Sequence, residues 1–183
     1  MMHTKNLKKY YFLNKFDYSH LINLNQNISF IWRNKDKETP LKSLIDLRYF
    51  CKKHKRKFFI SNDIKLAIKL DADGLYISST NKSLIIKPFI RKKKFEILGS
   101  AHNFREIRIK ELQGIDKIFL SPLFKDKKNQ KLNLYKYLNL KKVTSMKDVA
   151  LGGINSKNIK KLKLIKPFGF AAISYFEQKK GPL

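Results

Sequence analysis

Residues 58–77 read FFISNDIKLAIKLDADGLYI and contain two short apolar runs, at 58–60 and 74–77. Between these runs, Ile64, Ala67 and Ile68 recur at the spacing of one helical face. A strand, a helix and a second strand in this order are typical of a parallel βαβ unit. The stretch therefore predicts one unit of a parallel sheet covered by helices.

The same alternation extends along the rest of the chain. Apolar runs that fit strands occur eight times, at 10–13, 29–32, 58–60, 74–77, 96–99, 117–120, 149–151 and 168–173. Amphipathic segments lie between them: one helix is expected across 107–115, and Asn155 is placed to cap another that carries Ile159 and Leu162. Eight such units predict a closed (β/α)8 barrel, a TIM barrel. Such barrels usually need about 200–250 residues, so we expect a compact version that is truncated at the last helix.

Composition indicates a globular chain. Of the 183 residues, 43% are hydrophobic, which excludes a disordered polycation. We expect one domain over 1–183 with its core at about 10–176. No apolar run approaches the roughly 18–20 residues of a membrane span. The single cysteine, Cys51, cannot form an internal disulfide and is expected to pack inside a helix, which suits the cytoplasm; the sequence leaves a homo-oligomer open.

The charge of the chain is strongly positive. There are 41 Lys and Arg residues against 14 Asp and Glu residues, a formal net charge of +27, although only six of the basic residues are Arg. The densest basic runs, 52–57 and 91–94, each precede a strand-like run, which favours solvated helix ends over a nucleic-acid patch. A nucleic-acid-binding role stays open as an alternative. In either case the positive field attracts phosphorylated small molecules.

In such a barrel the active site forms where the strands end, so the polar residues there are candidates. Arg33 and Lys35 follow the second run and share one face of an extended chain. Two cations on one face suit a diphosphate. Asn62 and Asp63 follow the third run, where an amide could orient a ligand and a carboxylate could bind Mg²⁺ or cap a helix.

The later strand ends add further candidates. His102 follows the fifth run and is either a hydrogen-bonding residue or a general base. The polar segment 125–131 is either a lid or a solvated connection. Gly152 and Gly153 form a strand-to-helix turn whose backbone N–H groups could bind phosphate, and the eighth run ends at 173–174.

Three stretches resemble thiamine phosphate synthase and the related TenI proteins. The first runs from Asn62-Asp63 through Leu66-Ala67 to Ala72-Asp73-Gly74, the second is Ser121-Pro122-Leu123-Phe124, and the third spans 150–155. The resemblance covers about 10–176 and implies a transferase of thiamine biosynthesis with a (β/α)8 barrel. Such an enzyme joins hydroxymethylpyrimidine diphosphate to a thiazole phosphate, with loss of pyrophosphate and help from Mg²⁺.

The resemblance also implies roles for individual residues. The diphosphate substrate and its metal would be held by Arg33, Lys35, Asn62, Asp63 and Ser100, with Arg33, Lys35 and Asp63 catalytic. The thiazole phosphate would be bound by Gly152, Gly153, Ile173 and Ser174. His102, together with Lys127 and Lys128 of the polar segment, is expected to contact substrate. Mg²⁺ would be held by Asp63 and by Asn81.

The chain departs from the family pattern close to the reaction centre. Ile31 stands where the family has Gln, Tyr76 where it has His, and Asn81 where it has a second metal-binding carboxylate. Residues 125–128 contain no threonine, unlike the family loop. These departures leave a second hypothesis open: a TenI-like or non-catalytic barrel that binds a phosphorylated thiazole or pyrimidine.

Overall fold

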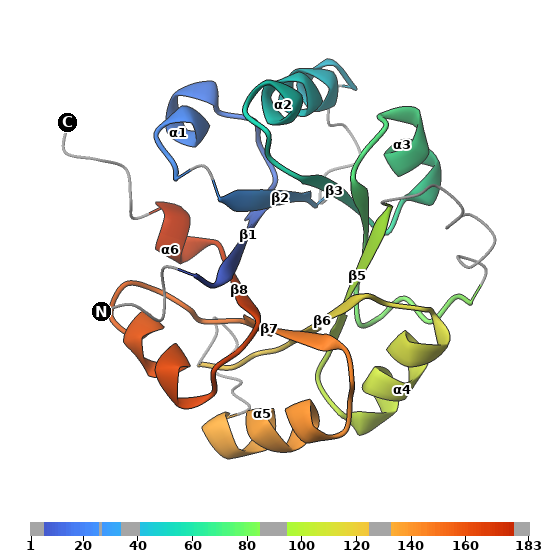
Figure 1. Cartoon of the computed structure of the whole chain (residues 1–183). Helices are drawn as coiled ribbons and strands as arrows, with labels where there is room; N and C mark the ends of the chain where they lie inside the picture. The colour runs from blue at the N-terminus through green and yellow to red at the C-terminus, as the bar shows by residue number, and fades with distance from the viewer. Residues whose placement is uncertain (1–5, 26, 34–40, 85–94, 125–132, 178–183) are drawn as a thin grey trace.

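The computed structural model describes residues 6–25, 27–33, 41–84, 95–124 and 133–177. In these ranges, eight parallel strands close into a barrel in which each strand pairs with the next and β8 pairs with β1 (Figure 1). The strands are β1 (Lys8–Leu13), β2 (Ile28–Trp32), β3 (Phe58–Ser61), β4 (Gly74–Ile77), β5 (Glu96–Ala101), β6 (Lys117–Leu120), β7 (Lys147–Leu151) and β8 (Gly169–Ala172). The predicted (β/α)8 barrel is confirmed.

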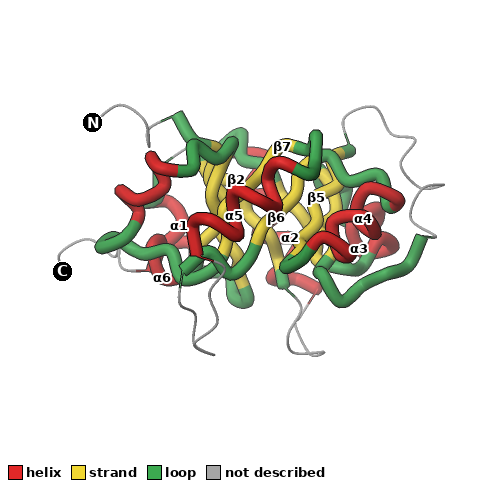
Figure 2. Tube along the Cα trace, turned by 90° about the horizontal axis from the view of Figure 1, so that it is seen from below, coloured by secondary structure: helices red, strands yellow, loops and turns green. Residues whose placement is uncertain are grey.

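The helices form an outer ring around the strands, as the two views show (Figures 1 and 2). They are α1 (Tyr18–Ile22), α2 (Leu41–Lys53), α3 (Ile64–Lys69), α4 (Phe104–Leu112), α5 (Asn133–Lys142), the 3₁₀ helix η2 (Ile159–Leu164) and α6 (Ser174–Glu177). The last of these has four residues, so the expected truncation of the final helix is confirmed. Short strands and short helices let 183 residues close a barrel.

The inside of the barrel is filled mainly by large side chains that point inward from successive strands. Alternate residues of a strand face opposite sides, and the inward set is Tyr10, Phe12, Ile31, Phe59, Tyr76, Leu98, Phe119, Val149 and Ala171. The Phe12 and Tyr76 rings meet edge to face, with centroids 5.1 Å apart. The interior is therefore a packed core, and an active site can lie only at one of its ends.

A second core lies between the strands and the helices. Trp32 and Phe30 point outward into it from β2, and Cys51 packs there from α2 with no exposed surface. Burial raises the pKa of the Cys51 thiol to about 12, which keeps it protonated and unreactive. The expectation that Cys51 packs as a small apolar residue is confirmed.

Two helix predictions were wrong in detail. The segment after β7 forms the 3₁₀ helix η2, and Asn155 does not cap it, because its Oδ1 accepts from the backbone N–H groups of Lys157 and Asn158 (2.9 and 3.2 Å) in the turn that precedes η2. The helix expected across 107–115 ends at Leu112. Gly114, at a φ of 72°, then turns the chain and Ile115 is buried beyond the helix.

The first of the two basic runs includes the end of a helix. Lys52 and Lys53 lie in the last turn of α2, as predicted for a helix C-terminus; the run 91–94 lies outside the described residues. None of the helices within the described ranges has the length and apolar character that crossing a membrane requires.

Candidate active site

A cavity of about 540 Å³ lies at the carboxyl ends of the strands. Six residues predicted from the sequence line it: Arg33, Asn62, Ser100, His102, Gly152 and Ile173. They come from five strand ends around the ring and from the segment after β5. The cavity therefore brings together the cationic side of the predicted site and the predicted Gly-Gly turn.

Arg33 supplies the positive charge of this cavity. Its backbone N–H donates to the carbonyl of Leu13 (2.8 Å), which fixes the residue at the end of β2. Its guanidinium lies 5.1 Å from the centroid of the Phe12 ring, and its buried Nε has no hydrogen-bond partner within the described residues. Burial lowers the pKa of Arg33, yet a guanidinium stays charged. The geometry leaves this cation ready for an anionic ligand.

Asn62 connects the ends of β3 and β4. It takes the left-handed conformation, with a φ of 58°, and its Oδ1 accepts from the backbone N–H of Ser78 (2.9 Å). Its Nδ2 donates to the Ser78 hydroxyl (3.1 Å), and Asn81 Nδ2 reaches its Oδ1 at 3.4 Å. This network shapes the cavity wall and brings the Asn81 side chain to the same place.

Asp63 is the N-cap of α3. Its Oδ1 accepts from the backbone N–H of Leu66 (2.9 Å), so the capping interpretation is confirmed. The side chain is exposed, and in the described part of the chain its Oδ2 has no hydrogen-bond partner. One carboxylate oxygen therefore stays available to a ligand while the other holds the helix.

The oxygen donors near Asp63 are few. The described residues contain no group of three His, Cys, Asp or Glu side chains that could enclose a metal. Asn81, the other predicted ligand, uses its Oδ1 to accept from the backbone N–H of Ser83 (3.0 Å). Mg²⁺ usually attaches through one or two carboxylates and completes its shell with water and substrate phosphates. The donor set fits a Mg²⁺ ion that arrives with a phosphorylated substrate, and does not fit a resident ion.

The loop that carries Ser78 and Asn81 is held from below by a buried lysine, which the sequence analysis missed. Lys110 of α4 is fully buried, and its Nζ donates to the carbonyls of Ser78 and Asn81 and to Gln113 Oε1, each at 2.8 Å. Gln113 Nε2 donates to the carbonyls of Asn81 and Ser83 (3.0 and 2.9 Å). Four of these five bonds fix this cavity loop, residues 78–83, to α4 and its C-cap, and the fifth joins Lys110 to Gln113.

Glycine in β5 makes room for this arrangement. A Cβ at Gly99 would lie 2.7 Å from Ile115 Cδ1 and 3.1 Å from Lys110 Cδ. A larger residue there would push α4 and its lysine outward, since these distances are shorter than ordinary van der Waals contact. The position of the cavity loop thus depends on a small residue on the strand behind it.

We expect Lys110→Met to change how stability depends on pH. Burial lowers the pKa of Lys110 from its ordinary 10.5 to about 8, so between these values the unfolded chain binds more protons than the folded one. The wild-type unfolding free energy should therefore gain up to about 3 kcal/mol, relative to the variant, as pH rises from 8 to 10.5. Urea unfolding of both proteins at pH 7.5 and pH 10 measures the difference.

An exposed lysine provides the control for this experiment. Lys160 points to solvent from η2, and Lys160→Met removes the same charge without touching the loop. If Lys160→Met showed a pH-dependent difference as large as that of Lys110→Met, the assignment to the buried amine would fail.

His102 is held by a carboxylate. Its Nδ1 lies 2.9 Å from Glu106 Oε2, and its backbone N–H donates to the same oxygen (2.7 Å). Asn103 caps α4 by accepting from the backbone N–H of Glu106 (2.9 Å). The predicted hydrogen-bonding role is confirmed, and with Nδ1 engaged the Nε2 atom is the one left for the cavity that His102 lines.

The turns after β6 and β7 pack directly against each other. Leu123 N–H donates to the carbonyl of Leu151 (2.8 Å) and Phe124 N–H to that of Gly152 (3.1 Å). Gly152 has a φ of 96°, and a Cβ there would lie 2.7 Å from Pro122 Cα. Glycine is thus required at this position both by backbone conformation and by close approach.

Gly153 continues this turn, and β8 ends beside it. Gly153 has a φ of 67°, and its carbonyl accepts from Asn158 Nδ2 (2.7 Å). Ile173 lines the cavity, and Ser174 is exposed at the first position of α6. The turns after β7 and β8 therefore border one side of the cavity, which is the usual place of a phosphate in such barrels.

Other predicted residues are placed beside the cavity or lie outside the description. Asp63, Asn81, Gly153 and Ser174 adjoin lining residues but do not line the cavity themselves. Lys35, Lys127 and Lys128 lie outside the described residues.

The sequence analysis missed several serines. The cavity is lined by five of them, of which only Ser100 was predicted; the others are Ser61, Ser78, Ser79 and Ser121. Ser61 ends β3, while Ser78 and Ser121 directly follow β4 and β6, so the rule that strand-end residues form the site would have found them. Tyr76 lies beneath them, and burial raises its pKa to about 12.

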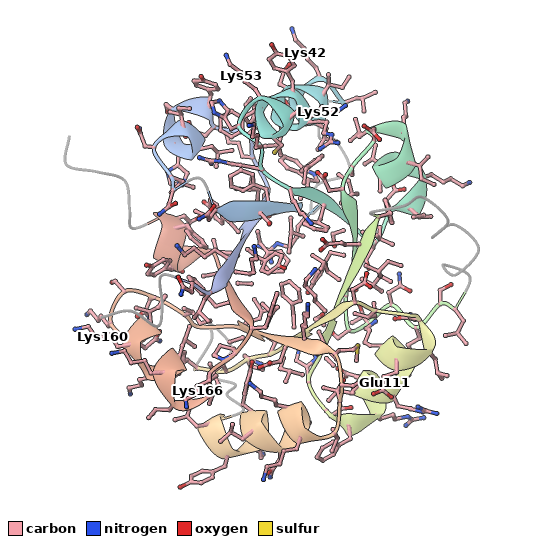
Figure 3. All side chains as sticks on the ribbon, viewed as in Figure 1. Lys42, Lys52, Lys53, Glu111, Lys160 and Lys166 are labelled. Carbon is pink, nitrogen blue, oxygen red and sulfur yellow. The ribbon has the colours of Figure 1, made fainter. Side chains whose placement is uncertain are left out.

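The charges on the helices are spread around the ring. Lys42, Lys52 and Lys53 point outward from α2, whereas Lys160 of η2 and Lys166, which follows η2, do so on another side (Figure 3). Lys52 also pairs with Asp71 (3.1 Å). These lysines cover separate helices rather than one face, as expected for solvated helix surfaces.

The protein is a closed parallel (β/α)8 barrel with a cavity at the carboxyl ends of its strands, which is where the enzymes with this fold have their active sites. Residues 24–176 match the sequence model of the family described as thiamine monophosphate synthase. The chain belongs to this family, which confirms the resemblance. It is a transferase of the thiamine phosphate synthase type, with a function in thiamine biosynthesis.

Individual relatives agree with this assignment. Over 170 residues the chain is 35% identical to the thiamine-phosphate synthase of Pelagibacter ubique, covering 88% of this chain and 81% of that protein. It is 32% identical over 138 residues to that of Prochlorococcus marinus, covering 69% of this chain but 39% of the longer relative. The fold is similar to the solved thiamine phosphate pyrophosphorylase of Pyrococcus furiosus, with a TM-score of 0.76, 17% identity and coverage of 97% and 93%.

Proposed function

We propose that this protein joins hydroxymethylpyrimidine diphosphate to thiazole phosphate and releases pyrophosphate. The bond between the pyrimidine methylene carbon and the diphosphate oxygen breaks, and its electron pair leaves with the diphosphate. The ring nitrogen of the thiazole then forms a bond to that carbon. The observation that carries the proposal is a single cavity that joins Arg33, whose buried Nε has no hydrogen-bond partner among the described residues, to a Gly-Gly turn at Gly152.

The diphosphate is assigned to the Arg33 side of the cavity. Arg33 binds it together with Lys35, and Ser100 and His102, whose Nδ1 is held by Glu106, line the same cavity. Cations and hydroxyl donors stabilise the negative charge that builds up on the leaving diphosphate. Asn62 positions this wall through Ser78 and adjoins the pyrimidine.

Mg²⁺ is assigned to Asp63, whose Oδ2 has no hydrogen-bond partner among the residues that the structure describes, with the neutral Asn81 as a weaker second ligand. When bound with the diphosphate, the ion would supply additional neutralisation of the leaving group. The replacement of a carboxylate by Asn81 should weaken metal binding, so a raised Mg²⁺ requirement is expected.

The thiazole phosphate is assigned to the opposite wall. Backbone N–H groups of Gly152 and Gly153 and the start of α6 at Ile173 and Ser174 provide donors without carrying charge. Lys127 and Lys128 are proposed to contact substrate from the segment that follows β6. When the diphosphate and the thiazole phosphate are bound at opposite walls, the thiazole nitrogen and the methylene carbon of the pyrimidine face each other in the middle of the cavity.

We also infer that residues 1–183 form one domain that works in the cytoplasm. The residues that line the cavity come from strand ends all around the barrel, so the site needs the whole chain. The single cysteine is buried and protonated, which suits a reducing compartment.

Direct reconstitution tests the proposed reaction. Purified protein is incubated with both precursors and Mg²⁺, and thiamine phosphate and pyrophosphate are measured by chromatography. Equal amounts of both products are expected, and none when either precursor is omitted. Binding of thiazole phosphate without any product at saturating concentrations would instead support a non-catalytic, TenI-like barrel.

A further inference from the structure

A second cavity, of about 340 Å³, lies at the opposite end of the barrel. It is lined by residues that lie at or just before the starts of the strands, among them Lys8, Lys55, Glu96, Lys117, Lys147 and Phe168. Because all eight strands are parallel, this cavity is separated from the candidate active site by the packed barrel interior.

The charge of this cavity is strongly unbalanced. Six basic residues face one acidic residue, Glu96. Lys57 and Lys117 both pair with that carboxylate, and Arg56 donates to the carbonyls of Leu21 and Leu24 (2.8 and 2.7 Å). Half of the basic groups are therefore already used by the protein itself.

The other three basic residues of the cavity are the lysines Lys8, Lys55 and Lys147. Within the described ranges, no carboxylate lies within ion-pair distance of Lys8, Lys55 or Lys147. Lys147 is moreover the direct neighbour of Lys117 in the register of β6 and β7, and like charges side by side on neighbouring strands are unfavourable. An anion of two or more charges would remove this repulsion.

The wall of the cavity adds an aromatic surface. Lys147 Nζ lies 5.1 Å from the centroid of the Phe168 ring, which is half buried, and Tyr10 closes the inner side. A concave site of this volume fits a small molecule, at the lower end of the usual range for ligand pockets. Lysine amines recognise phosphate as point charges and without strict geometry.

We propose that this cavity is a second anion site, which binds a small oligophosphate, that is, a compound with two or more linked phosphoryl groups. The phosphates contact Lys8, Lys55 and Lys147, and any attached ring packs on Phe168. The site is distinct from the transferase cavity and its occupation does not depend on the coupling reaction. Its chemistry is shared by inorganic oligophosphates and by nucleotides.

Calorimetric titration with tripolyphosphate tests the proposal in the full-length protein. Two sites are expected in the wild type, one at each end of the barrel. Lys8→Gln/Lys147→Gln keeps the side-chain stems of two exposed residues and should weaken the second site at least tenfold, while coupling activity stays within twofold. Repeating the titration with adenosine triphosphate and with adenosine shows whether the ring on Phe168 adds affinity.

The matched control is Lys160→Gln/Lys163→Gln. It removes two exposed charges from η2 and should leave both sites intact. If Lys8→Gln/Lys147→Gln weakened no tripolyphosphate site of the wild type, or if both double variants weakened binding equally, the proposal would be overturned, since the second result would mean that only net charge attracts the phosphate. If the wild-type protein showed no coupling activity, the proposed transferase function would be contradicted. The expected weakening of the second site by Lys8→Gln/Lys147→Gln would still hold.

Discussion

Arg33→Ala is expected to lower kcat/KM for the coupling reaction by about 10²–10³-fold. The guanidinium is the charged group of the cavity whose buried Nε lacks a partner among the described residues, so it is held ready for the leaving diphosphate. Because negative charge on that group increases toward the transition state, the loss should fall mainly on kcat rather than on KM. Steady-state kinetics with both precursors measures the effect.

The variant should fold. The backbone N–H of Arg33 keeps its bond to Leu13 after truncation, and the contact that the side chain loses among the described residues, with the Phe12 ring, is worth about 0.5–1 kcal/mol. Arg33→Lys is the matched control, which keeps the charge but not the planar fork, and should recover part of the rate. An unchanged kcat in Arg33→Ala, with folding verified by urea unfolding, would reject the assigned role.

The barrel could be predicted from the sequence because its signals are local. Each strand is a short apolar run, and inward residues such as Phe59 and Leu98 alternate with outward ones along it. Once the count reaches eight parallel units, closure follows, and with it the end of the barrel at which polar residues such as Arg33 and Gly152 meet. The meeting of Arg33 and Gly152 at one cavity therefore follows from the order of the strands alone, whereas their roles in the reaction stay a prediction.

Lys110 shows what the sequence could not reveal. It lies on the same helix face as the buried Ile107, where an apolar residue is expected, and a lysine there is usually assigned to solvent. Its partners are carbonyls of a loop about 30 residues earlier in the chain. Because every residue has a backbone carbonyl, the residue types do not show which carbonyls accept the bonds from Lys110. Only the three-dimensional structure identifies them.

The two alternatives considered for Asp63 both apply to the same side chain. Residue type and position predicted either a helix cap or a metal ligand. The structure confirms the cap through one oxygen, and the other oxygen has no hydrogen-bond partner in the described ranges. A carboxylate has two oxygens, so the two roles do not compete. The sequence pattern cannot separate them, but substitutions can.

Asp63→Asn is expected to lower coupling activity at least about 100-fold and to leave stability nearly unchanged. Asparagine caps helices about as well as aspartate, so α3 keeps its bond to the backbone N–H of Leu66 and the unfolding free energy should change by less than about 0.5 kcal/mol. The amide carries no negative charge, so the Mg²⁺ concentration needed for half-maximal rate should rise. Urea unfolding and a Mg²⁺ titration of the rate measure the two effects separately.

Asp63→Ala completes the comparison because it removes both functions. It should lose activity as Asp63→Asn does, and in addition about 1 kcal/mol of stability through the missing cap. If Asp63→Asn kept wild-type activity at low Mg²⁺ while Asp63→Ala lost activity and stability together, the carboxylate would be a cap alone. The binding of Mg²⁺ would then have to come from the substrate diphosphate and from Asn81, whose side chain already meets Asn62 at 3.4 Å.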